Sequence, residues 1–279
     1  MNAPVNKIIP FSSVDGPGNR TAIFLQGCNF NCRYCHNPET LKVCVHCGTC
    51  LEFCPTGALS RKGGWIAYDH TKCAYCDACF KHCPHSASPR IRMMEPEEVM
   101  REVNRNVPFI RGITVSGGEC TQHAPFLYRL LALAKAQGLD TLLDSNGSYD
   151  FSQDEKLLSV TDGVMLDVKA WNAQEHLHIT GCDNAPVLRN LKYLAENAKR
   201  EEVRTVIVPG LFDTEDTVRQ VSRALAPHLS KRSIRYKIIA YRPMGVREEY
   251  QTLRSPTPDE LRAHEAIARS EGMEEIVLI

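Results

Sequence analysis

Short apolar runs alternate with amphipathic stretches along most of the chain. Runs rich in β-branched residues predict strands at 21–26, 112–116, 141–145, 163–168, 203–208 and 235–240. Stretches with helical periodicity predict helices at 96–106, 126–136, 186–199 and 215–226. Pro96 suits a first helical position. Ser152 with Glu155, and Thr257 with Glu260, have the spacing of capping boxes and predict two further helix starts. This alternation predicts a parallel sheet, barrel-like or open, with its working groups at the carboxyl ends of the strands.

The segment 42–90 breaks this pattern. It is rich in cysteine, punctuated by glycine and proline, and short of long apolar periods. Such a segment cannot build an ordinary hydrophobic core and depends on whatever its thiolates bind. The sequence therefore predicts an inserted, metal-dependent module at 42–90, with residues 1–41 and 91–279 forming the α/β domain.

Composition narrows the functional classes. The chain has 279 residues, enough for one or two domains, and 33 basic against 33 acidic residues. Zero net charge argues against a nucleic-acid partner. No run approaches the roughly 18 apolar residues of a membrane span, and no basic-then-apolar leader opens the chain, so we expect a cytoplasmic protein without a membrane partner. Thirteen cysteines in a reducing compartment indicate metal ligation rather than disulfides.

Eight of the cysteines form two copies of one motif. C-x2-C-x2-C-x3-C followed by proline is found at Cys44, Cys47, Cys50 and Cys54, and again at Cys73, Cys76, Cys79 and Cys83. This spacing is the bacterial ferredoxin signature, in which three thiolates bind one [4Fe-4S] cluster and the fourth binds the other. The expected sets are Cys44, Cys47 and Cys50 with Cys83, and Cys73, Cys76 and Cys79 with Cys54. The alternative is a pair of structural zinc sites, although zinc sites usually use separated C-x2-C pairs.

A third cysteine group lacks a fourth member. Cys28, Cys32 and Cys35 are spaced C-x3-C-x2-C, with no further cysteine at a matching distance. A cluster held by three thiolates leaves one iron open to an exogenous ligand, which favours chemistry over electron transfer alone. The alternatives are a chance triplet or a zinc site completed by His36.

The residues around this triplet resemble a known family. Residues 13–20 read SVDGPGNR, 24–28 read FLQGC and 32–39 read CRYCHNPE. This opening is similar to that of the glycyl-radical-enzyme activating enzymes of the radical S-adenosylmethionine (SAM) superfamily. A twin-ferredoxin insert directly behind it is similar to the larger members. The resemblance extends over nearly the whole chain and implies a partial (β/α)6 barrel carrying an inserted 2[4Fe-4S] ferredoxin-like domain.

The resemblance also implies an activity. Such an enzyme is an anaerobic oxidoreductase with three [4Fe-4S] clusters, and Cys28, Cys32 and Cys35 hold the catalytic one. In the family, SAM is cleaved reductively to a 5′-deoxyadenosyl radical, which abstracts hydrogen from a glycine of a partner glycyl-radical enzyme. The usual electron donor is a flavodoxin or ferredoxin. Which glycyl-radical enzyme is activated, and the oligomeric state, stay open at this point.

Residues at the ends of the predicted strands match the family's SAM contacts. Beside the triplet these are Tyr34, Cys35 and His36. Gly117, Gly118 and Glu119 match the run that binds the methionine amino group, and two glycines at a strand end let a ligand approach the backbone, although a plain turn is the alternative. Asp167, Val168 and Lys169 match the run that handles ribose and methionine carboxylate.

Four further positions carry weaker assignments. Asp144 matches an aspartate that helps hold a monovalent cation in some relatives, or else belongs to an ordinary Asn-Gly turn. Arg204 is similar to an arginine near the cofactor, with a salt bridge as the alternative. Arg242 stands where many relatives have histidine, so its role is in doubt. Asp15 is expected to contact the partner.

Two other functions remain possible on sequence alone. A ferredoxin-like electron carrier would explain eight cysteines but leave Cys28, Cys32 and Cys35 without a task. A radical SAM enzyme acting on a small molecule or peptide usually carries its extra clusters near the C-terminus, whereas this chain has no cysteine after Cys182. The sequence also leaves open whether the insert relays electrons or docks the partner.

Overall fold

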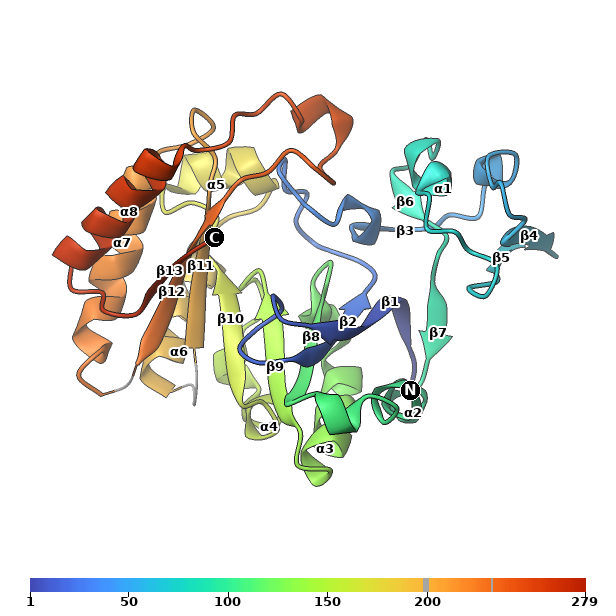
Figure 1. The fold of residues 1–279 in the computed structure, drawn as a ribbon, viewed down its shortest axis with the longest axis horizontal. Coiled ribbons are helices and arrows are strands. Elements are labelled where there is room, and N and C mark those ends of the chain that lie inside the picture. The colour runs from blue at the N-terminus through green and yellow to red at the C-terminus, as the bar shows by residue number, and fades with distance from the viewer. Residues whose placement is uncertain (198–200, 232) are drawn as a thin grey trace.

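One large sheet organises the molecule. The computed structural model describes residues 1–197, 201–231 and 233–279. Within them the large sheet has nine strands in the spatial order β13-β12-β11-β10-β9-β8-β2-β1-β7. Residues 42–90 form a smaller part that projects beside β1 and β7 (Figure 1).

Seven neighbouring strands of the large sheet are parallel. They are β2 (Arg20–Leu25), β8 (Gly112–Gly117), β9 (Asp140–Ser145), β10 (Gly163–Asp167), β11 (Glu201–Ile207), β12 (Ile234–Ala240) and β13 (Ile276–Leu278). The other two, β1 (Ala3–Ser12) and β7 (Arg92–Met94), run antiparallel to their neighbours. Because β13 and β7 lie at opposite edges, the sheet is an open, partial barrel, as expected for the α/β fold class.

All six strands expected from the sequence are present, with ends shifted by one or two residues. β1, β7 and β13 were not expected. β1 contains two prolines and two register irregularities against β2, which hide its alternation, and β13 has only three residues. Short or irregular strands leave little periodic signal in a sequence.

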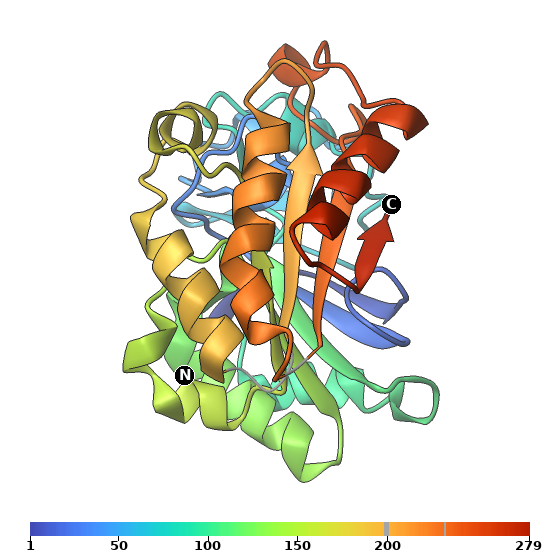
Figure 2. The same cartoon turned by 90° about the vertical axis from the view of Figure 1, so that its left-hand side faces the viewer.

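Helices cover one face of the sheet. They are α2 (Pro96–Val103), α3 (Ala124–Ala136), α4 (Glu155–Ser159), α6 (Ala185–Asn197), α7 (Thr214–Leu225) and α8 (Pro258–Ser270). The helix α5 (Ala173–Thr180) lies instead at the carboxyl end of the strands, where its last two carbonyls accept from the backbone of the cysteine loop. Figure 2 shows α6, α7 and α8 side by side in front of the strands. The four helices predicted by periodicity are confirmed, although α2 ends earlier than expected. Residue 199, the predicted end of α6, lies outside the described residues.

Of the two predicted capping boxes, one is correct. At α8 the Thr257 side chain accepts from the Glu260 backbone N–H, and the Glu260 carboxylate accepts from the Thr257 N–H. The box at Ser152 is wrong. Asp154 caps α4, while the Ser152 hydroxyl donates to Asp150, because a carboxylate is the stronger acceptor for the free N–H groups at each turn.

The two faces of the sheet differ in polarity. Apolar side chains such as Val115, Leu143 and Val203 are fully buried in the core beneath the helices. The alternate positions on the opposite face include polar and charged residues, listed in strand order as Thr114, Ser116, Asp144, Asp167, Glu202, Arg204 and Lys237. Successive side chains of a strand point to opposite faces. Charges inside a barrel are costly unless they are paired or meet a ligand, so this face positions the candidate site.

Residues 42–90 contain little regular structure. β3 (Lys42–Val43) pairs with β6 (Ala87–Ser88), which brings the two ends of the segment together. Between them lie a hairpin, β4 (Leu59–Lys62) with β5 (Trp65–Tyr68), and the short helix α1 (Ala78–Lys81). The segment's buried cluster consists of two cysteines with Leu59 and Ile66. This small core agrees with a module that depends on its thiolates, and the exact boundaries 42–90 stay a prediction.

Candidate active site and cluster cysteines

A cavity of about 230 Å³ lies at the carboxyl ends of the parallel strands. The predicted residues that line it are Cys28, Cys32, Tyr34, Cys35, His36, Gly117, Gly118, Asp144, Asp167, Lys169 and Arg204. They come from the loop after β2 and from β8, β9, β10 and β11 or the turns that follow. The fold thus brings together side chains that are up to 176 residues apart in the sequence.

The cysteine triplet occupies the loop after β2. Cys32 is buried, and Cys28 and Cys35 are half-buried. Backbone bonds from Gly27 to Thr40 and from Cys28 to Leu41 close the loop that carries them. Burial raises the pKa of the Cys28 and Cys32 thiols to about 12. Thiolates in such a place need a cation, and three buried sulfurs on one cavity fit an iron–sulfur cluster, whose binding displaces the thiol protons.

No fourth cysteine from the described parts of the chain lines this cavity. Cys120 is buried elsewhere and donates to the Asp144 carbonyl, in line with its interpretation as a buried thiol. Cys182 donates to the Asn29 carbonyl. His36 lines the cavity, and its Nε2 contacts the Arg242 carbonyl at 2.9 Å.

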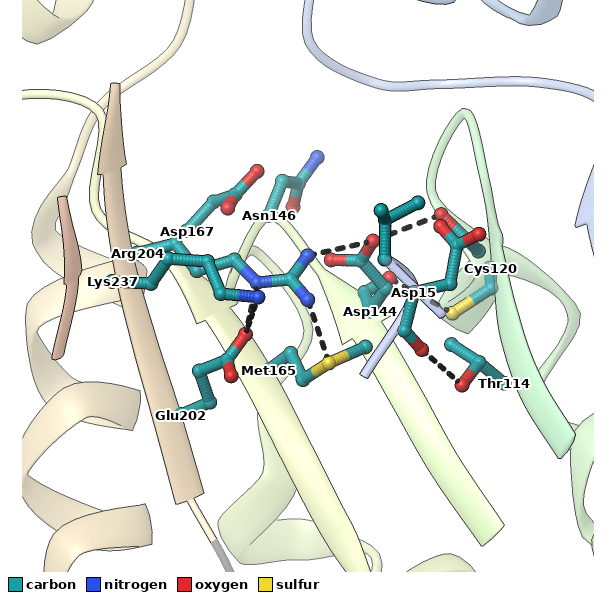
Figure 3. Close-up of polar contacts among 12 residues, drawn as sticks. Asp15, Thr114, Cys120, Asp144, Asn146, Met165, Asp167, Glu202, Arg204 and Lys237 are labelled. Atoms are coloured by element: carbon teal, nitrogen blue, oxygen red, sulfur yellow. Dashed lines mark hydrogen bonds and ion pairs between the residues drawn. The ribbon is translucent and has the colours of Figure 1, made fainter. Parts of the chain in front are cut away.

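Charged groups of both signs face the cavity. Arg204 lies between two carboxylates, with Nη1 3.1 Å from Asp144 Oδ2 and Nε 2.6 Å from Glu202 Oε1 (Figure 3). Lys237 contacts the same Glu202 oxygen at 3.0 Å. The sequence suggested either a residue near the cofactor or a salt-bridge partner. The structure is compatible with both, because Arg204 lines the cavity and also forms ion pairs.

The pKa of the Asp144 carboxyl is raised. Burial is the main cause, and the nearby carboxylates of Asp167 and Asp15 add to it, while Arg204 and a 3.0 Å hydrogen bond from Ser116 oppose it. Burial acts to lower the pKa of Lys169, but Asp167, paired with it at 2.7 Å, together with Cys32 and Tyr34 outweighs burial and holds this pKa well above its usual range. Acids and bases so arranged can bind the ammonium and carboxylate groups of one zwitterionic ligand.

The two glycines at the end of β8 have a packing reason besides the expected one. A Cβ atom on Gly118 would lie 2.0 Å from the Gly27 carbonyl oxygen, and one on Gly117 would lie 2.1 Å from the Leu25 carbonyl oxygen. Gly117 also has a φ of +126°. Both glycines line the cavity, but close packing of β8 on the end of β2 is what excludes a side chain.

Glu119 does not line the cavity but lies directly behind its wall. Its buried carboxylate accepts hydrogen bonds from both the backbone and the hydroxyl of Thr121, from Ser145 Oγ and from the Asn146 backbone. Burial raises the pKa of Glu119 despite these bonds. The carboxylate thus joins the turn after β8 to the end of β9.

Three other predicted residues lie outside the cavity lining. The Val168 backbone N–H donates to the Arg204 carbonyl, and its side chain is buried. Arg242 is exposed. Asp15 accepts from Ser12, and its carbonyl accepts from Thr114 Oγ1, which places it near Asp144 on the inner face of the sheet (Figure 3).

The insert cysteines form two neighbouring groups, and their division into two ligand sets stays a prediction. One small cavity is lined by Cys54, Cys73, Cys76 and Cys79 together. In the other half, Cys83 is near enough to Cys44 and Cys50 to affect the pKa of both thiols. This grouping fits the crossed pattern of a two-cluster ferredoxin.

The two motifs also share their backbone geometry. His46 and Tyr75, each two residues after the first cysteine of its motif, have φ of 58° and 53°. The His46 N–H donates to Cys44 Sγ at 3.3 Å, and the Tyr75 N–H donates to Cys73 Sγ at 3.4 Å. N–H groups directed at sulfur stabilise thiolates, so both loops are built as cluster-binding loops.

Comparisons with known proteins agree with this geometry. The profile of the "Radical SAM superfamily" matches residues 70–225, that of the "4Fe-4S dicluster domain" matches 43–87, and that of the "4Fe-4S single cluster domain" matches 14–51. A putative glycyl-radical enzyme activating enzyme of Haemophilus influenzae is 32% identical over 99% of this chain and 96% of its own length. The pyruvate formate-lyase-activating enzyme of Streptococcus mutans is 30% identical over 97% and 92%.

The chain belongs to the glycyl-radical-enzyme activating enzymes of the radical SAM superfamily. This activase is therefore an oxidoreductase with [4Fe-4S] clusters and SAM as cofactors and a glycyl-radical enzyme as its protein substrate. A solved domain of a pyruvate-formate lyase-activating enzyme from Bacteroides vulgatus shares the fold, with a TM-score of 0.52 at 18% identity over 60% of this chain and 98% of that one. Throughout the described ranges, no helix of the activase is long and apolar enough to cross a membrane.

Several residues of the activase site were not expected from its sequence. Ser116 and Asn146 line the cavity, and Glu202 with Lys237 holds Arg204 in place. A signal existed for Glu202 and Arg204, which are charged residues at alternate positions on either side of Val203 in β11.

Arg247 was also missed. Its Nη2 donates to the Cys32 carbonyl at 3.0 Å, so the loop after β12 packs on the cysteine loop. No local pattern in the sequence indicates this contact, because 215 residues separate its two partners.

Proposed function

We propose that this activase installs a radical on the backbone of one glycine in a separate glycyl-radical enzyme, using Cys28, Cys32 and Cys35 to hold its catalytic cluster. The observation that carries the proposal is the cavity on which these three thiols meet charged groups of both signs, without a fourth cysteine from the described residues. When bound, the cluster and SAM supply one-electron reductive cleavage that yields a 5′-deoxyadenosyl radical able to take hydrogen from glycine.

The residues of the cavity wall would hold and orient SAM. Asp144 and Asp167 offer carboxylates to the amino group and the ribose hydroxyls, and Lys169 and Arg204 offer cations to the carboxylate. The ion pairs of Lys169 and Arg204 fix these cations before a ligand arrives, which lowers the cost of ordering them on binding. Tyr34 and His36 complete the wall beside the cluster loop.

Tyr34 adds an observation of its own. Its hydroxyl is buried and has no hydrogen-bond partner within the described parts of the chain, although Tyr34 lines the cavity. A buried hydroxyl without a partner is costly, and a bound polar cofactor would supply one. This orphaned group therefore fits a ligand that fills the cavity.

Asp15 is our candidate for contact with the partner enzyme. It lies in the loop between β1 and β2, on the inner face of the sheet near Asp144. A short flexible loop of the partner would have to reach this face for a backbone glycine to approach the cavity. Relatives at about 30% identity over nearly the full chain favour a protein substrate over a small molecule or an electron-carrier role.

Electrons would enter through the insert from a reduced flavodoxin or ferredoxin. The segment 42–90 has six basic residues and three acidic ones, hence a charge of +3 in a chain whose total is zero. A basic segment favours encounter with an acidic carrier. Two clusters with crossed ligands suit a relay, and a cytoplasmic location suits carriers of this kind.

The deciding experiment is anaerobic reconstitution followed by a SAM cleavage assay. We expect about twelve iron atoms per chain from three four-iron clusters, formation of 5′-deoxyadenosine, and a glycyl-radical EPR signal on the partner. Replacing Cys28, Cys32 and Cys35 by alanine together should remove about one third of the iron and abolish both products.

Cys182→Ala is the matched control, since Cys182 lies outside every expected ligand set, and it should keep full iron and activity. A colourless protein with stoichiometric zinc would contradict the proposal. So would continued cleavage in the triple variant.

A further inference from the structure

Arg90 is a buried cation next to one of the two insert cluster sites. Its side chain is 9% exposed and lines the cavity formed by Cys54, Cys73, Cys76 and Cys79. The guanidinium is close enough to Cys79 and Cys73 to interact with both thiols electrostatically. Its Nε–H is buried and has no hydrogen-bond partner among the described residues.

The charge of Arg90 is only partly balanced. Its Nη2 is 2.5 Å from Asp77 Oδ1, but the Asp77 side chain is half-exposed, and water screens that carboxylate. Arg90 also lines a second cavity, together with Tyr75, Lys7 and Glu39, where the insert meets β1 and the loop behind the catalytic cysteines. The cation therefore lies at the junction between the insert and the α/β domain.

The other half of the insert has no equivalent. Arg61 donates to the Cys47 carbonyl at 2.9 Å, but Arg61 is exposed, and so is Cys47. A charge in a buried, low-dielectric place acts on its neighbours far more strongly than an exposed one. The two cluster sites thus differ in their electrostatic surroundings although their cysteine motifs are the same.

We propose that Arg90 sets the reduction potential of the cluster held by Cys54, Cys73, Cys76 and Cys79, making it the more easily reduced of the two insert clusters. Reduction adds one negative charge to a thiolate-bound cluster, and a buried cation with a free N–H donor stabilises that charge. Arg90 is a positioning residue in this role, and the negative charge of Asp77 reduces its effect on the cluster. The inference rests on the cluster occupancy of the proposed function.

The test is an EPR-monitored redox titration of the full chain, reconstituted anaerobically in a Cys28, Cys32, Cys35→Ala background so that only the insert clusters report. Arg90→Met should lower one of the two midpoint potentials by about 59 mV or more, a tenfold fall in the one-electron equilibrium constant, and leave the other unchanged. Arg90→Lys should restore most of the shift because it restores the charge. Arg61→Met is the matched control and should not move the Arg90-sensitive potential.

Asp77→Asn separates this role from a structural one. It keeps Arg90 but removes the opposing carboxylate, so the same midpoint should rise, and asparagine tolerates the φ of 60° found at this position. Unchanged midpoints in both Arg90→Met and Asp77→Asn at full insert iron would overturn the inference. If Arg90→Met loses iron, the Asp77→Asn titration decides alone, and the absence of a positive shift overturns it. SAM cleavage by the intact activase is measured separately, so the proposed function can stand while this inference fails.

Discussion

Glu119 follows two glycines at the end of β8, and its carboxylate contacts protein rather than the cavity. Four hydrogen bonds reach it from Thr121, Ser145 and Asn146. A glutamine there would keep one acceptor oxygen and turn an NH2 group toward groups that are themselves donors. A substitution of Glu119 therefore distinguishes a carboxylate that stabilises the fold from one that binds the ligand.

Glu119→Gln should lower the free energy of unfolding by about 1–3 kcal/mol, because buried donors lose their acceptor. Anaerobic urea denaturation of the iron-loaded activase measures this. SAM affinity should change little, whereas Asp167→Ala, on the cavity wall, should weaken SAM binding by roughly 1–3 kcal/mol. Loss of SAM binding by Glu119→Gln at full stability would show instead that the carboxylate contacts the cofactor.

Among single residues, the sequence indicated those that can be recognised from their immediate neighbours in the chain. Asp144, Asp167 and Lys169 stand at the ends of apolar strands, where an unpaired charge would be costly, and the fold gathers them. Lys237 gave no such signal, since its partner Glu202 lies on the neighbouring strand, 35 residues earlier. Pairing across strands depends on register, which a single sequence does not display.

At the scale of elements, the end of β8 packs directly on the end of β2. The contact leaves no room for a Cβ at Gly118, because the Gly27 and Thr40 carbonyl oxygens would lie 2.0 and 2.8 Å from it. Both atoms belong to backbone that leads into or closes the cysteine loop. They cannot turn aside as a side chain could.

Gly118→Ala should therefore destabilise the activase by about 1–3 kcal/mol and also reduce iron at the catalytic cluster, since the loop before Cys28 must shift. Iron analysis and the thermal midpoint measure the two effects. Gly64→Ala is the control, because a Cβ there meets nothing within 4 Å. Full iron content with impaired SAM binding in Gly118→Ala would favour the original explanation, that the glycine leaves space for the ligand.

Asp162 joins two elements at the opposite end of the sheet. It is 2.6 Å from Lys135 at the end of α3 and accepts from the backbone N–H of Thr141 in β9. Burial alone would raise the pKa of Asp162, but these bonds outweigh it and lower the pKa below its usual range. A lowered pKa in the folded state means that the stabilisation is present above the unfolded pKa, near 4, and is lost as the pH falls through the folded value.

Asp162→Asn should cost about 1–3 kcal/mol at pH 7, because a charged acceptor is lost, and the difference from the wild type should shrink as the pH falls below 4. Urea denaturation at several pH values follows this difference. Glu215→Gln, at an exposed position on α7, provides a control for exchanging a carboxylate for an amide at the surface. A cost for Asp162→Asn that does not change with pH would mean that the carboxylate charge plays no part.

Helices and strands with a strong hydrophobic periodicity were predicted well, whereas those with a weak periodicity were missed. The six central strands carry apolar residues at the positions that face the helices, which the parallel sheet requires on its covered face. β1 gave no clear signal because its register slips twice against β2 and it faces both β2 and β7. β1 joins β7 to β2, and this role follows from strand pairing rather than from a periodic pattern.

For the whole molecule, the insert is a second unit placed within the first. Cysteine spacing alone predicted it, because motif and ligand geometry are local properties of the chain. The cavity that Arg90, Tyr75, Lys7 and Glu39 line between the two parts was beyond sequence reasoning, since nothing local links positions 7 and 90. It shows that the insert lies beside the loop behind the catalytic cysteines, which is where a relay would have to end.

If the insert relays electrons, breaking its clusters should matter only when electrons must pass through it. Cys54→Ala and Cys83→Ala each remove the ligand that one half of the insert contributes to the other half's cluster. Both variants should slow 5′-deoxyadenosine formation far more with a reduced flavodoxin than with a small chemical reductant that reaches the catalytic cluster directly. Equal losses with both donors would indicate that the insert serves folding. Normal SAM cleavage without a radical on the partner would indicate that it docks the partner enzyme instead.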